Sequence, residues 1–277
     1  HYMVMKRGSD NTDKCAGARV AALLLLFVIS FNYLYARTIV VSRSPTDEVI
    51  HAFNTIGEAL AIAAYGDTVL IRGGSYEEYG LSVPDGVSLI GTGLVHIKGE
   101  LAVTATIREV NETATIDMFG NGRLENITVS ARNMRYPVHS DFSPGNTRQD
   151  IVNCSFIHYG SREIYEYRKE RGMLSPDGPD NIFRVQSAWG VVTMAGARRY
   201  FTGCYFESPL RGFSTHNNVS FNLSYGASHT ELKNCVMVSH GIDLDVSPLG
   251  FAAPVVIQRL ESNAPDLVVL SACLIHG

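Results

Sequence analysis

Short runs of apolar and β-branched residues recur along the chain, and turn residues separate them. The first runs cover residues 38–41, 68–71 and 87–90, and glycines end the second and third. β-Branched residues favour strands, whereas glycine favours the turns between them. Many short strands predict an all-β fold. Comparable runs follow at residues 127–129, 151–157, 191–193, 200–206, 230–238, 255–257 and 267–275.

The segment between the first two runs has helical periodicity. Thr55 and Glu58 match a capping box, in which each side chain satisfies a backbone N–H of the first turn. Apolar residues at positions 56, 59, 60 and 63 share one helical face, and Gly66-Asp67 ends the pattern. Because an exposed strand edge invites aggregation, we predict a short N-terminal helix that covers the first strand edge.

The strands contain an internal repeat. Three copies place a cysteine at the same point of a four-residue core, at residues 153–156, 203–206 and 234–237. Residues 126–129 form a fourth copy with Ile127 in the cysteine position, and residues 271–274 form a fifth. The copies starting at residues 126, 153, 203 and 234 are separated by 27, 50 and 31 residues. Since a solenoid tolerates loops of different length at its turns, we predict a single-stranded right-handed parallel β-helix over residues 37–277, continuing beyond this fragment.

The cysteines are predicted to be structural. Cys154, Cys204, Cys235 and Cys273 all occupy the repeat, and Cys15 lies outside it. Equivalent residues of neighbouring coils stack about 4.8 Å apart, so these thiols should form an inward ladder. We favour this interpretation over disulfides, and the absence of a C-x-x-C pair disfavours a zinc site.

Residues 1–36 are predicted to be a secretory signal peptide. Four basic residues precede the apolar run at residues 20–31, and Ala36 is a small residue near its end. The run is shorter than the roughly 20 residues of a spanning helix, so export with cleavage is favoured over a retained anchor. The sequence therefore predicts a secreted or cell-surface protein without stable membrane insertion.

Composition excludes some partners. Hydrophobic residues make up 45% of the chain and charged residues 18%, which is an ordinary globular balance. The formal net charge is -4, and lysine and arginine are scattered, so we do not expect nucleic acid binding. Composition leaves the oligomeric state open.

The segment from residue 53 to 93 resembles the opening of the pectin-lyase-like superfamily, which includes pectinesterases, polysaccharide lyases and phage tail spikes. The matching pieces are residues 55–60, 66–71, 74–78 and 87–91. The resemblance implies a right-handed parallel β-helix and says little about chemistry. Residues 136–141 and 211–218 resemble β-helix proteins of bacterial surfaces and phages.

Within the superfamily, residues 190–194 and 204–206 resemble two strands of pectinesterases. In that family a Gln-Asp-Thr segment with the catalytic aspartate follows, but here residues 209–212 read Pro-Leu-Arg-Gly. The sequence therefore argues against the methylesterase mechanism.

Two histidines have equal offsets from the repeat. His139 lies 13 residues after Asn126, and His216 lies 13 residues after Gly203. If the coils stack in register, both histidines belong to one polar stripe on a flank of the solenoid.

Further polar residues accompany this stripe. Arg135 and Arg211 precede the two histidines, and arginine and asparagine supply directed hydrogen bonds to hydroxyl and uronate oxygens. Polar residues on a solenoid flank are also often simply solvated. The remaining candidates are Asp141, Asn217, Asn218, Asp243 and Asp245.

The stripe suits an acidic polysaccharide, and two chemistries remain open. In a lyase, His139 or His216 would remove a proton beside a carboxylate, and Arg135 or Arg211 would stabilise the developing charge. A hydrolase would instead need two carboxylates.

The carboxylates available to a hydrolase are Asp141 with Asp243 or Asp245. The pair Asp243 and Asp245 is also a candidate Ca²⁺ site if its segment is extended; otherwise we expect no cofactor.

We therefore predict a secreted carbohydrate-active protein of lyase or hydrolase type. The alternative is a non-catalytic glycan-binding adhesin or tail-spike-like module, and a purely structural spacer is a third interpretation. Residues 159–182 form a charged insertion in which Tyr165 and Tyr167 are candidates for stacking on sugar rings.

Overall fold

The computed structural model describes residues 36–43, 52–140, 143–174, 190–193, 196–218, 229–242, 253–260 and 267–277. Two compact units divide the chain, residues 1–37 and 38–277, and the fold below is that of the second. The predicted signal peptide lies outside the described residues except for Ala36. Within the described ranges, no helix is long and apolar enough to cross a membrane.

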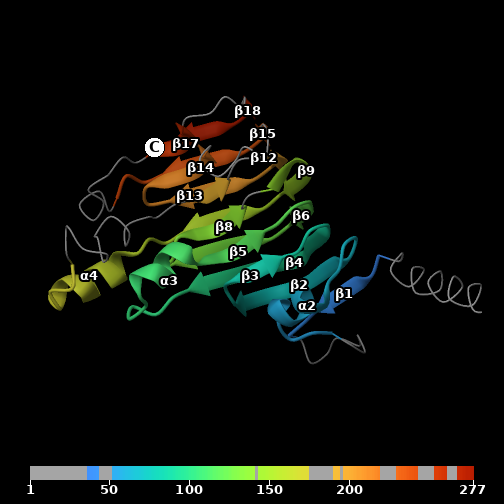
Figure 1. Cartoon of the computed structure of the whole chain (residues 1–277), viewed down its shortest axis with the longest axis horizontal. Helices are drawn as coiled ribbons and strands as arrows, with labels where there is room; N and C mark the ends of the chain where they lie inside the picture. Colours follow the sequence, from blue (N-terminus) through green and yellow to red (C-terminus); the bar gives the residue numbers. More distant parts are fainter. Residues whose placement is uncertain are drawn as a thin grey trace, which may run out of the picture. The chain divides into compact units, whose positions relative to one another are not determined.

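The strands pair in parallel and form a 13-stranded and a six-stranded sheet (Figure 1). Strand β4 pairs with β6 through its first half and with β7 through its second half, so the larger sheet turns a corner. We call its two parts sheet 1 and sheet 2, and the smaller sheet is sheet 3. Sheet 1 contains the first halves of β2 (Thr68–Glu77) and β4 (Val87–Glu100), with β1 (Thr38–Val41), β6 (Gly122–Glu125), β9 (Ser143–Val152), β12 (Gly196–Thr202), β15 (His229–Lys233) and β18 (Leu267–Ser271).

The other two sheets repeat the same order along the chain. Sheet 2 contains the second halves of β2 and β4, with β7 (Thr128–Arg132), β10 (Ser155–His158), β13 (Tyr205–Ser208), β16 (Val236–Ser239) and β19 (Leu274–His276). Sheet 3 contains β3 (Leu81–Val83), β5 (Ala114–Met118), β8 (Tyr136–Ser140), β11 (Val191–Thr193), β14 (Arg211–Asn218) and β17 (Ala253–Leu260).

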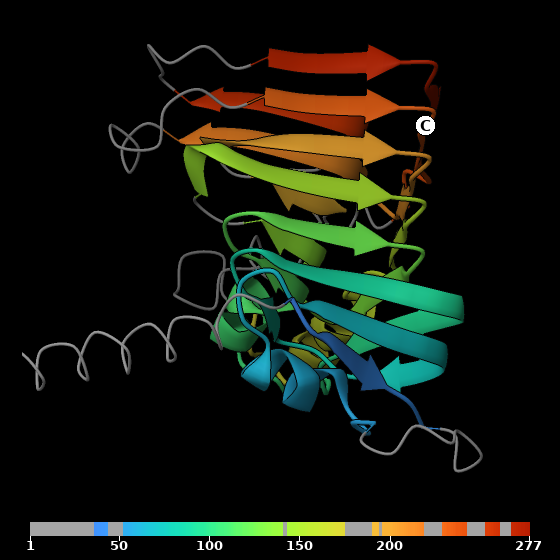
Figure 2. The ribbon, with the colours of Figure 1, turned by 90° about the vertical axis from the view of Figure 1, so that its right-hand side faces the viewer.

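Each coil passes through sheets 1, 2 and 3 in turn, and Figure 2 shows the strands stacked as successive rungs. This arrangement confirms the predicted parallel β-helix. Parallel crossovers are right-handed in about 98% of cases, which is the sense predicted for this coil.

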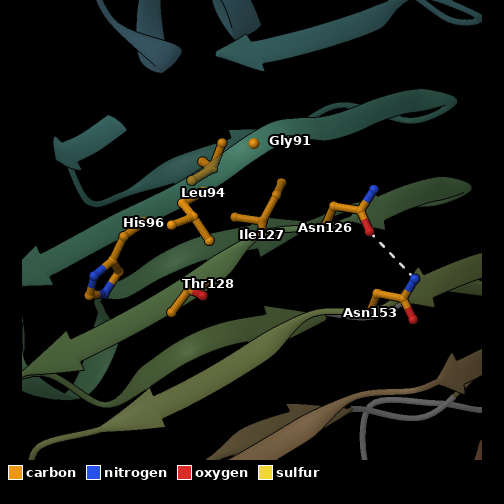
Figure 3. A pocket seen from close by; sticks show the side chains of 9 residues that line it. Gly91, Leu94, His96, Asn126, Ile127, Thr128 and Asn153 are labelled. Atoms are coloured by element: carbon orange, nitrogen blue, oxygen red, sulfur yellow. Dashed lines mark hydrogen bonds between the residues drawn. The ribbon is translucent and has the colours of Figure 1, made fainter. Parts of the chain in front are cut away.

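The repeat forms the corner between sheets 1 and 2. Its first residue has a left-handed backbone, with φ between 52° and 66°, in all five copies. Asparagine and glycine adopt this conformation most readily. Asn153 Nδ2 donates to Asn126 Oδ1 on the preceding coil at 3.4 Å (Figure 3). The five copies begin at Asn126, Asn153, Gly203, Asn234 and Ala272, so the fifth copy starts one residue later than predicted.

The second residue of the repeat points into the core. Cys154, Cys204 and Cys235 are each 1% exposed, and all four described cysteines are free thiols, which confirms the predicted ladder. Burial raises the pKa of the Cys154 thiol to about 12, so it stays protonated and packs as an apolar group. Phe156 and Phe206 stack beside this row.

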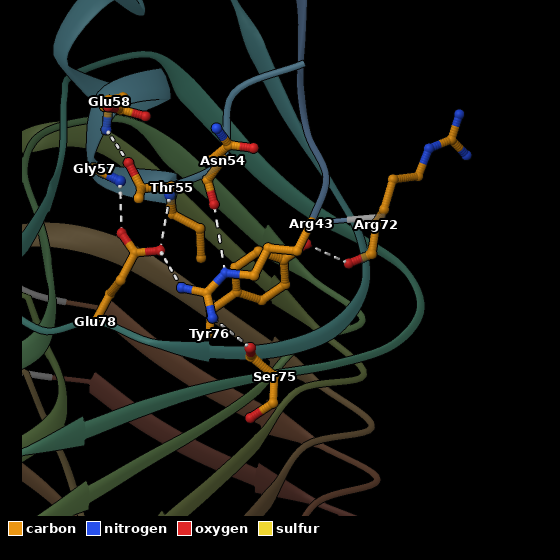
Figure 4. Close-up of polar contacts among 10 residues, drawn as sticks. Arg43, Asn54, Thr55, Gly57, Glu58, Arg72, Ser75, Tyr76 and Glu78 are labelled. Carbon is orange, nitrogen blue, oxygen red and sulfur yellow. Dashed lines mark hydrogen bonds and ion pairs between the residues drawn. The ribbon is translucent and has the colours of Figure 1, made fainter. Parts of the chain in front are cut away.

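Helix α2 (Ile56–Ile62) is the predicted N-terminal helix and packs against β1, β2 and β3. The Thr55 hydroxyl accepts the Glu58 N–H as expected, and Glu78 caps two further N–H groups of the helix. Its carboxylate accepts N–H groups of Ile56 and Gly57 at 3.0 and 2.9 Å. The guanidinium of Arg43 lies 3.9 Å from this carboxylate (Figure 4). These contacts tie the helix start to β2, while the predicted covering of the strand edge stays a prediction.

Two further helices, α3 (Ile107–Glu112) and α4 (Arg162–Glu170), were not expected from the sequence. Both lie between sheet 2 and sheet 3 of their coils. They share a second apolar cluster that contains Ile107, Val110 and Ile164. Of the two tyrosines proposed for sugar stacking, Tyr165 packs against this cluster, and the ring of Tyr167 faces the guanidinium of Arg171 at 3.8 Å.

Candidate functional site

The outer face of sheet 3 holds a histidine–carboxylate pair. Asp117 on β5 and His139 on β8 are direct neighbours in the strand register. Nδ1 of His139 lies 2.9 Å from Oδ1 of Asp117, and the two side chains are 19% and 22% exposed. A carboxylate at Nδ1 fixes the ring so that Nδ1 carries the proton and Nε2 is left as the basic nitrogen. This is the arrangement of an oriented general base.

Aromatic and cationic groups lie beside this pair. The ring of Tyr136 stacks on the imidazole of His139, with centroids 5.0 Å apart and an interplanar angle of 9°. The guanidinium of Arg135 lies 4.8 Å from the Tyr136 centroid, and its Nη1 donates to the Asn111 carbonyl at 3.2 Å. Arg211 is buried, which lowers the pKa of its guanidinium, while the nearby Tyr136 acts on that pKa in the opposite direction.

A buried polar network lies on the inner side of the same strand. Ser140 follows His139 and donates to Oε1 of Gln149 at 2.6 Å. The fully buried Arg199 donates from Nε to Ser140 Oγ at 3.0 Å, and from Nη1 to the Gly196 carbonyl at 2.9 Å. Buried networks of this kind fix local geometry, so the end of β8 is anchored from within.

The register places the two predicted histidines two strand positions apart. His139 pairs with Val192, and Val192 pairs with Ser214, whereas His216 pairs with Gln258 on the far side. His216 therefore lies two residues beyond the position equivalent to His139. The equal offsets in sequence do not give equal strand positions, because the path from sheet 2 to sheet 3 differs in length between coils. Ser130 and Glu207 are equivalent through Ile157, and residues 131–135 lead from Ser130 to β8, whereas only residues 208–210 lead from Glu207 to β14.

The other sequence candidates are only partly placed. Asn217 and Asn218 pair with Arg259 and Leu260 in β14 and β17, and their side chains lie outside the description. Asp141, Asp243 and Asp245 lie outside the described residues, so the hydrolase carboxylates and the Ca²⁺ site stay predictions. Among the described residues, no cluster of three His, Cys, Asp or Glu side chains forms a metal site.

Asp117 was not among the residues predicted from the sequence. It lies 22 residues before His139, on the previous coil, and no repeat position marks it. Only the parallel pairing of β5 with β8 brings the two side chains together. The pairing could have been found by estimating the length of each coil separately, because the coil between Asp117 and His139 is 22 residues long.

Comparison with known proteins gives similarities of structure alone. No protein-family model and no curated protein sequence matches the chain. A pectin methylesterase mutant solved with a hexasaccharide has 16% identity and a TM-score of 0.40, over 81% of this chain and 66% of its own. Pectate lyase Pel9A has 12% identity and a TM-score of 0.41, over 74% and 55%. PemA, a pectin methylesterase from Erwinia chrysanthemi, has 13% identity and a TM-score of 0.34, over 73% and 79%.

The chain spans less than two thirds of the length of the first two of these proteins. At such identities and TM-scores, the similarities concern the backbone and say nothing of activity. The parallel coils themselves form the β-helix that the sequence predicted.

Proposed function

We propose that the outer face of sheet 3 binds an acidic polysaccharide and that His139 removes a proton from it in a lyase-type β-elimination. The observation that supports this proposal is the His139–Asp117 pair, because it holds a partly exposed imidazole with one basic nitrogen directed by a carboxylate. His158, by contrast, is buried and its two ring nitrogens contact backbone groups.

The chemistry needs a base and a cation. His139 Nε2 would take the proton from the carbon next to the uronate carboxyl group, and a double bond would form as the bond from the neighbouring carbon to the glycosidic oxygen breaks. The leaving oxygen would take a proton from water and depart as a sugar hydroxyl group. Arg211 and Arg135 would stabilise the charge that develops on the carboxyl group. Both lie near Tyr136, whose ring stacks on the base.

The alternative is a glycan-binding module without turnover. The same surface supports it, since arginine and histidine bind uronate oxygens in the ground state as well. Turnover by His139 distinguishes the two.

The first prediction is loss of turnover in site variants. With uronate-containing polysaccharides, His139→Ala should abolish the ultraviolet absorbance of the unsaturated product. Asp117→Asn should lower kcat by about 10²–10⁴-fold, because the ring loses its oriented tautomer.

A matched control is His240→Ala. His240 also pairs with a carboxylate, at 2.7 Å from Glu207, but it follows β16 of sheet 2. This variant should retain full activity. Equal rates in wild type and His139→Ala would contradict the proposal, and binding without any product would favour the alternative.

A further inference from the structure

A second polar surface lies far from the His139 pair in the coil path, at the corner between sheets 1 and 2. Here a hollow of about 410 Å³ is lined by residues from three successive coils (Figure 3). Small-molecule sites usually enclose about 300–1,000 Å³. The lining residues are Gly91, Gly93, Leu94, Val95, His96, Asn126, Ile127, Thr128 and Asn153.

An enlarged corner creates the hollow. In the strand register Ile90 is opposite Glu125 and His96 is opposite Thr128. Five residues, 91–95, therefore face only the two residues 126 and 127 of the next coil. A Cβ on Gly91 would lie 2.3 Å from the Asn126 carbonyl oxygen, and Gly93 has a φ of +81°. The sequence supplies glycine at the points where this wide corner requires it.

The walls of the hollow combine an apolar tip with fixed polar groups. Leu94 at the tip of the corner is 94% exposed. His96 is held by a hydrogen bond between its Nε2 and Ser130 Oγ at 2.8 Å. Asn126 is held through its Oδ1 by Asn153, so its amide nitrogen points away from Asn153 (Figure 3). A leucine beside fixed amide, hydroxyl and imidazole groups suits a sugar ring, which has an apolar face and hydroxyl edges.

One cation, Lys98, lies beside the hollow. Lys98 lies two residues after His96 on the outer face of β4, is exposed, and is opposite Glu77 of β2. Burial, and to a lesser extent the charge of Lys98, lower the pKa of His96. The residues that line the hollow include no carboxylate. A ligand with hydroxyl groups and one negative charge therefore fits better than a neutral or cationic one.

We infer that this corner is a binding subsite for one acidic sugar residue of a polysaccharide. Leu94 would cover the apolar face of the ring, Asn126, Thr128 and His96 would bind its hydroxyl groups, and Lys98 would pair with its carboxylate. The inference rests on the ligand class of the proposed function and not on turnover at His139. It predicts that a long chain contacts two separate places on the solenoid.

The test is a nuclear magnetic resonance titration of the full chain with labelled leucine methyl and histidine ring groups. The probes are a trisaccharide of galacturonic acid and the neutral trisaccharide of galactose. We expect the acidic probe alone to shift the Leu94 and His96 resonances in a saturable manner. Leu94→Ala should weaken this binding about tenfold, and Lys98→Gln should remove the preference for the acidic probe.

The controls separate folding from binding. Because Leu94 is almost fully exposed, Leu94→Ala should leave stability unchanged. Leu274, 62% exposed on β19, gives a matched leucine, and Leu274→Ala should leave the binding unchanged. Unshifted Leu94 and His96 resonances, or equal binding of both probes, would overturn the inference. Saturable Leu94 shifts in a protein that gives no product from any substrate would overturn the proposed lyase and leave the subsite standing.

Discussion

At the scale of single residues, burial decides which histidines are available for chemistry. His158 ends β10 with its side chain inside the solenoid and is 2% exposed. Its Nε2 lies 2.8 Å from the Met134 carbonyl, and its Nδ1 accepts the Gly160 N–H at 2.8 Å. Both ring nitrogens are thus used by the backbone in the neutral form, and burial lowers the pKa to about 4. His158 is a structural residue, in contrast to His139.

This buried histidine predicts a pH-dependent stability. In the unfolded chain His158 has a pKa near 6.5, so between about pH 6.5 and 4 the unfolded state binds a proton that the folded state does not. The free energy of unfolding should therefore fall as the pH drops through this window, by up to about 3 kcal/mol. Denaturant titrations at several pH values measure this fall.

The control for the pH effect is His158→Gln. The variant should be less stable at pH 7, since the cavity and its hydrogen bonds change, but its stability should depend less on pH between 6.5 and 4. His96, whose pKa is also lowered, contributes to both proteins and cancels in the comparison. Identical pH slopes in the two proteins would count against the assignment.

The sequence analysis predicted one of the two residues of the histidine–carboxylate pair. His139 was predicted from its polar context, and Asp117 was not, because a partner on the preceding coil has no fixed distance in sequence. The hydrogen bond between them depends on strand register, which the sequence specifies only through the sum of many packing contacts.

At the scale of elements, residues 74–78 connect strand β2 to the N-terminal helix. Tyr76 is fully buried, its hydroxyl donates to the Arg72 carbonyl, and the guanidinium of Arg43 lies 5.0 Å from its ring centroid. Glu78 then reaches the start of α2. Residues 74–78, which belong to the segment whose sequence resembles other β-helix proteins, therefore serve to attach helix α2 to the first complete coil.

The contacts of Glu78 lead to a prediction for the variant Glu78→Gln. The amide keeps the shape but loses the charge that binds two helix N–H groups and faces Arg43, so the free energy of unfolding should fall by about 1–2 kcal/mol. The exposed neighbour Glu77 provides the control, because Glu77→Gln should change stability by less than about 0.5 kcal/mol. Equal denaturation midpoints for the two variants would contradict the role given to Glu78.

Helix α3 shows what element prediction missed. Thr106 and Glu109 form a complete capping box, with bonds of 2.7 and 3.2 Å, so the local signal was present in the sequence. The helix has only six residues, and its stability comes from the second apolar cluster, which α4 completes from 50 residues further on. Such contacts between distant segments outweigh local propensity in short helices.

At the scale of the whole solenoid, stability is expected to vary from coil to coil, because each coil contacts only its neighbours. Leu270 and Ile275 pair with the buried Leu232 and Met237, yet they are 41% and 48% exposed. The described residues 267–276 therefore expose positions that are buried in the preceding coils.

The cysteine ladder reports this gradient. In the native protein an alkylating reagent should label Cys273 faster than Cys154, which is buried and has a raised pKa. Peptide mapping by mass spectrometry follows each thiol separately, and denaturant should make all of them reactive. Equal labelling rates for Cys273 and Cys154 in the native state would contradict a coil-by-coil stability.

The solenoid was predictable from the sequence because its repeat marks one corner directly, with an asparagine or glycine before an inward residue. The sheet 3 surface was not, because no comparable residue marks the corner that precedes it.

This difference between the corners bears on how the protein can change during evolution. From β6 onward, each described corner between sheets 1 and 2 contains two residues, such as Asn153 and Cys154. The connections on either side of sheet 3 vary in length. An insertion at the constant corner would interrupt the row of left-handed asparagine or glycine residues and inward cysteines that continues from coil to coil, while an insertion beside sheet 3 would leave that row intact. We therefore expect homologous chains to gain and lose segments around sheet 3, so that new binding specificities arise there on an unchanged solenoid.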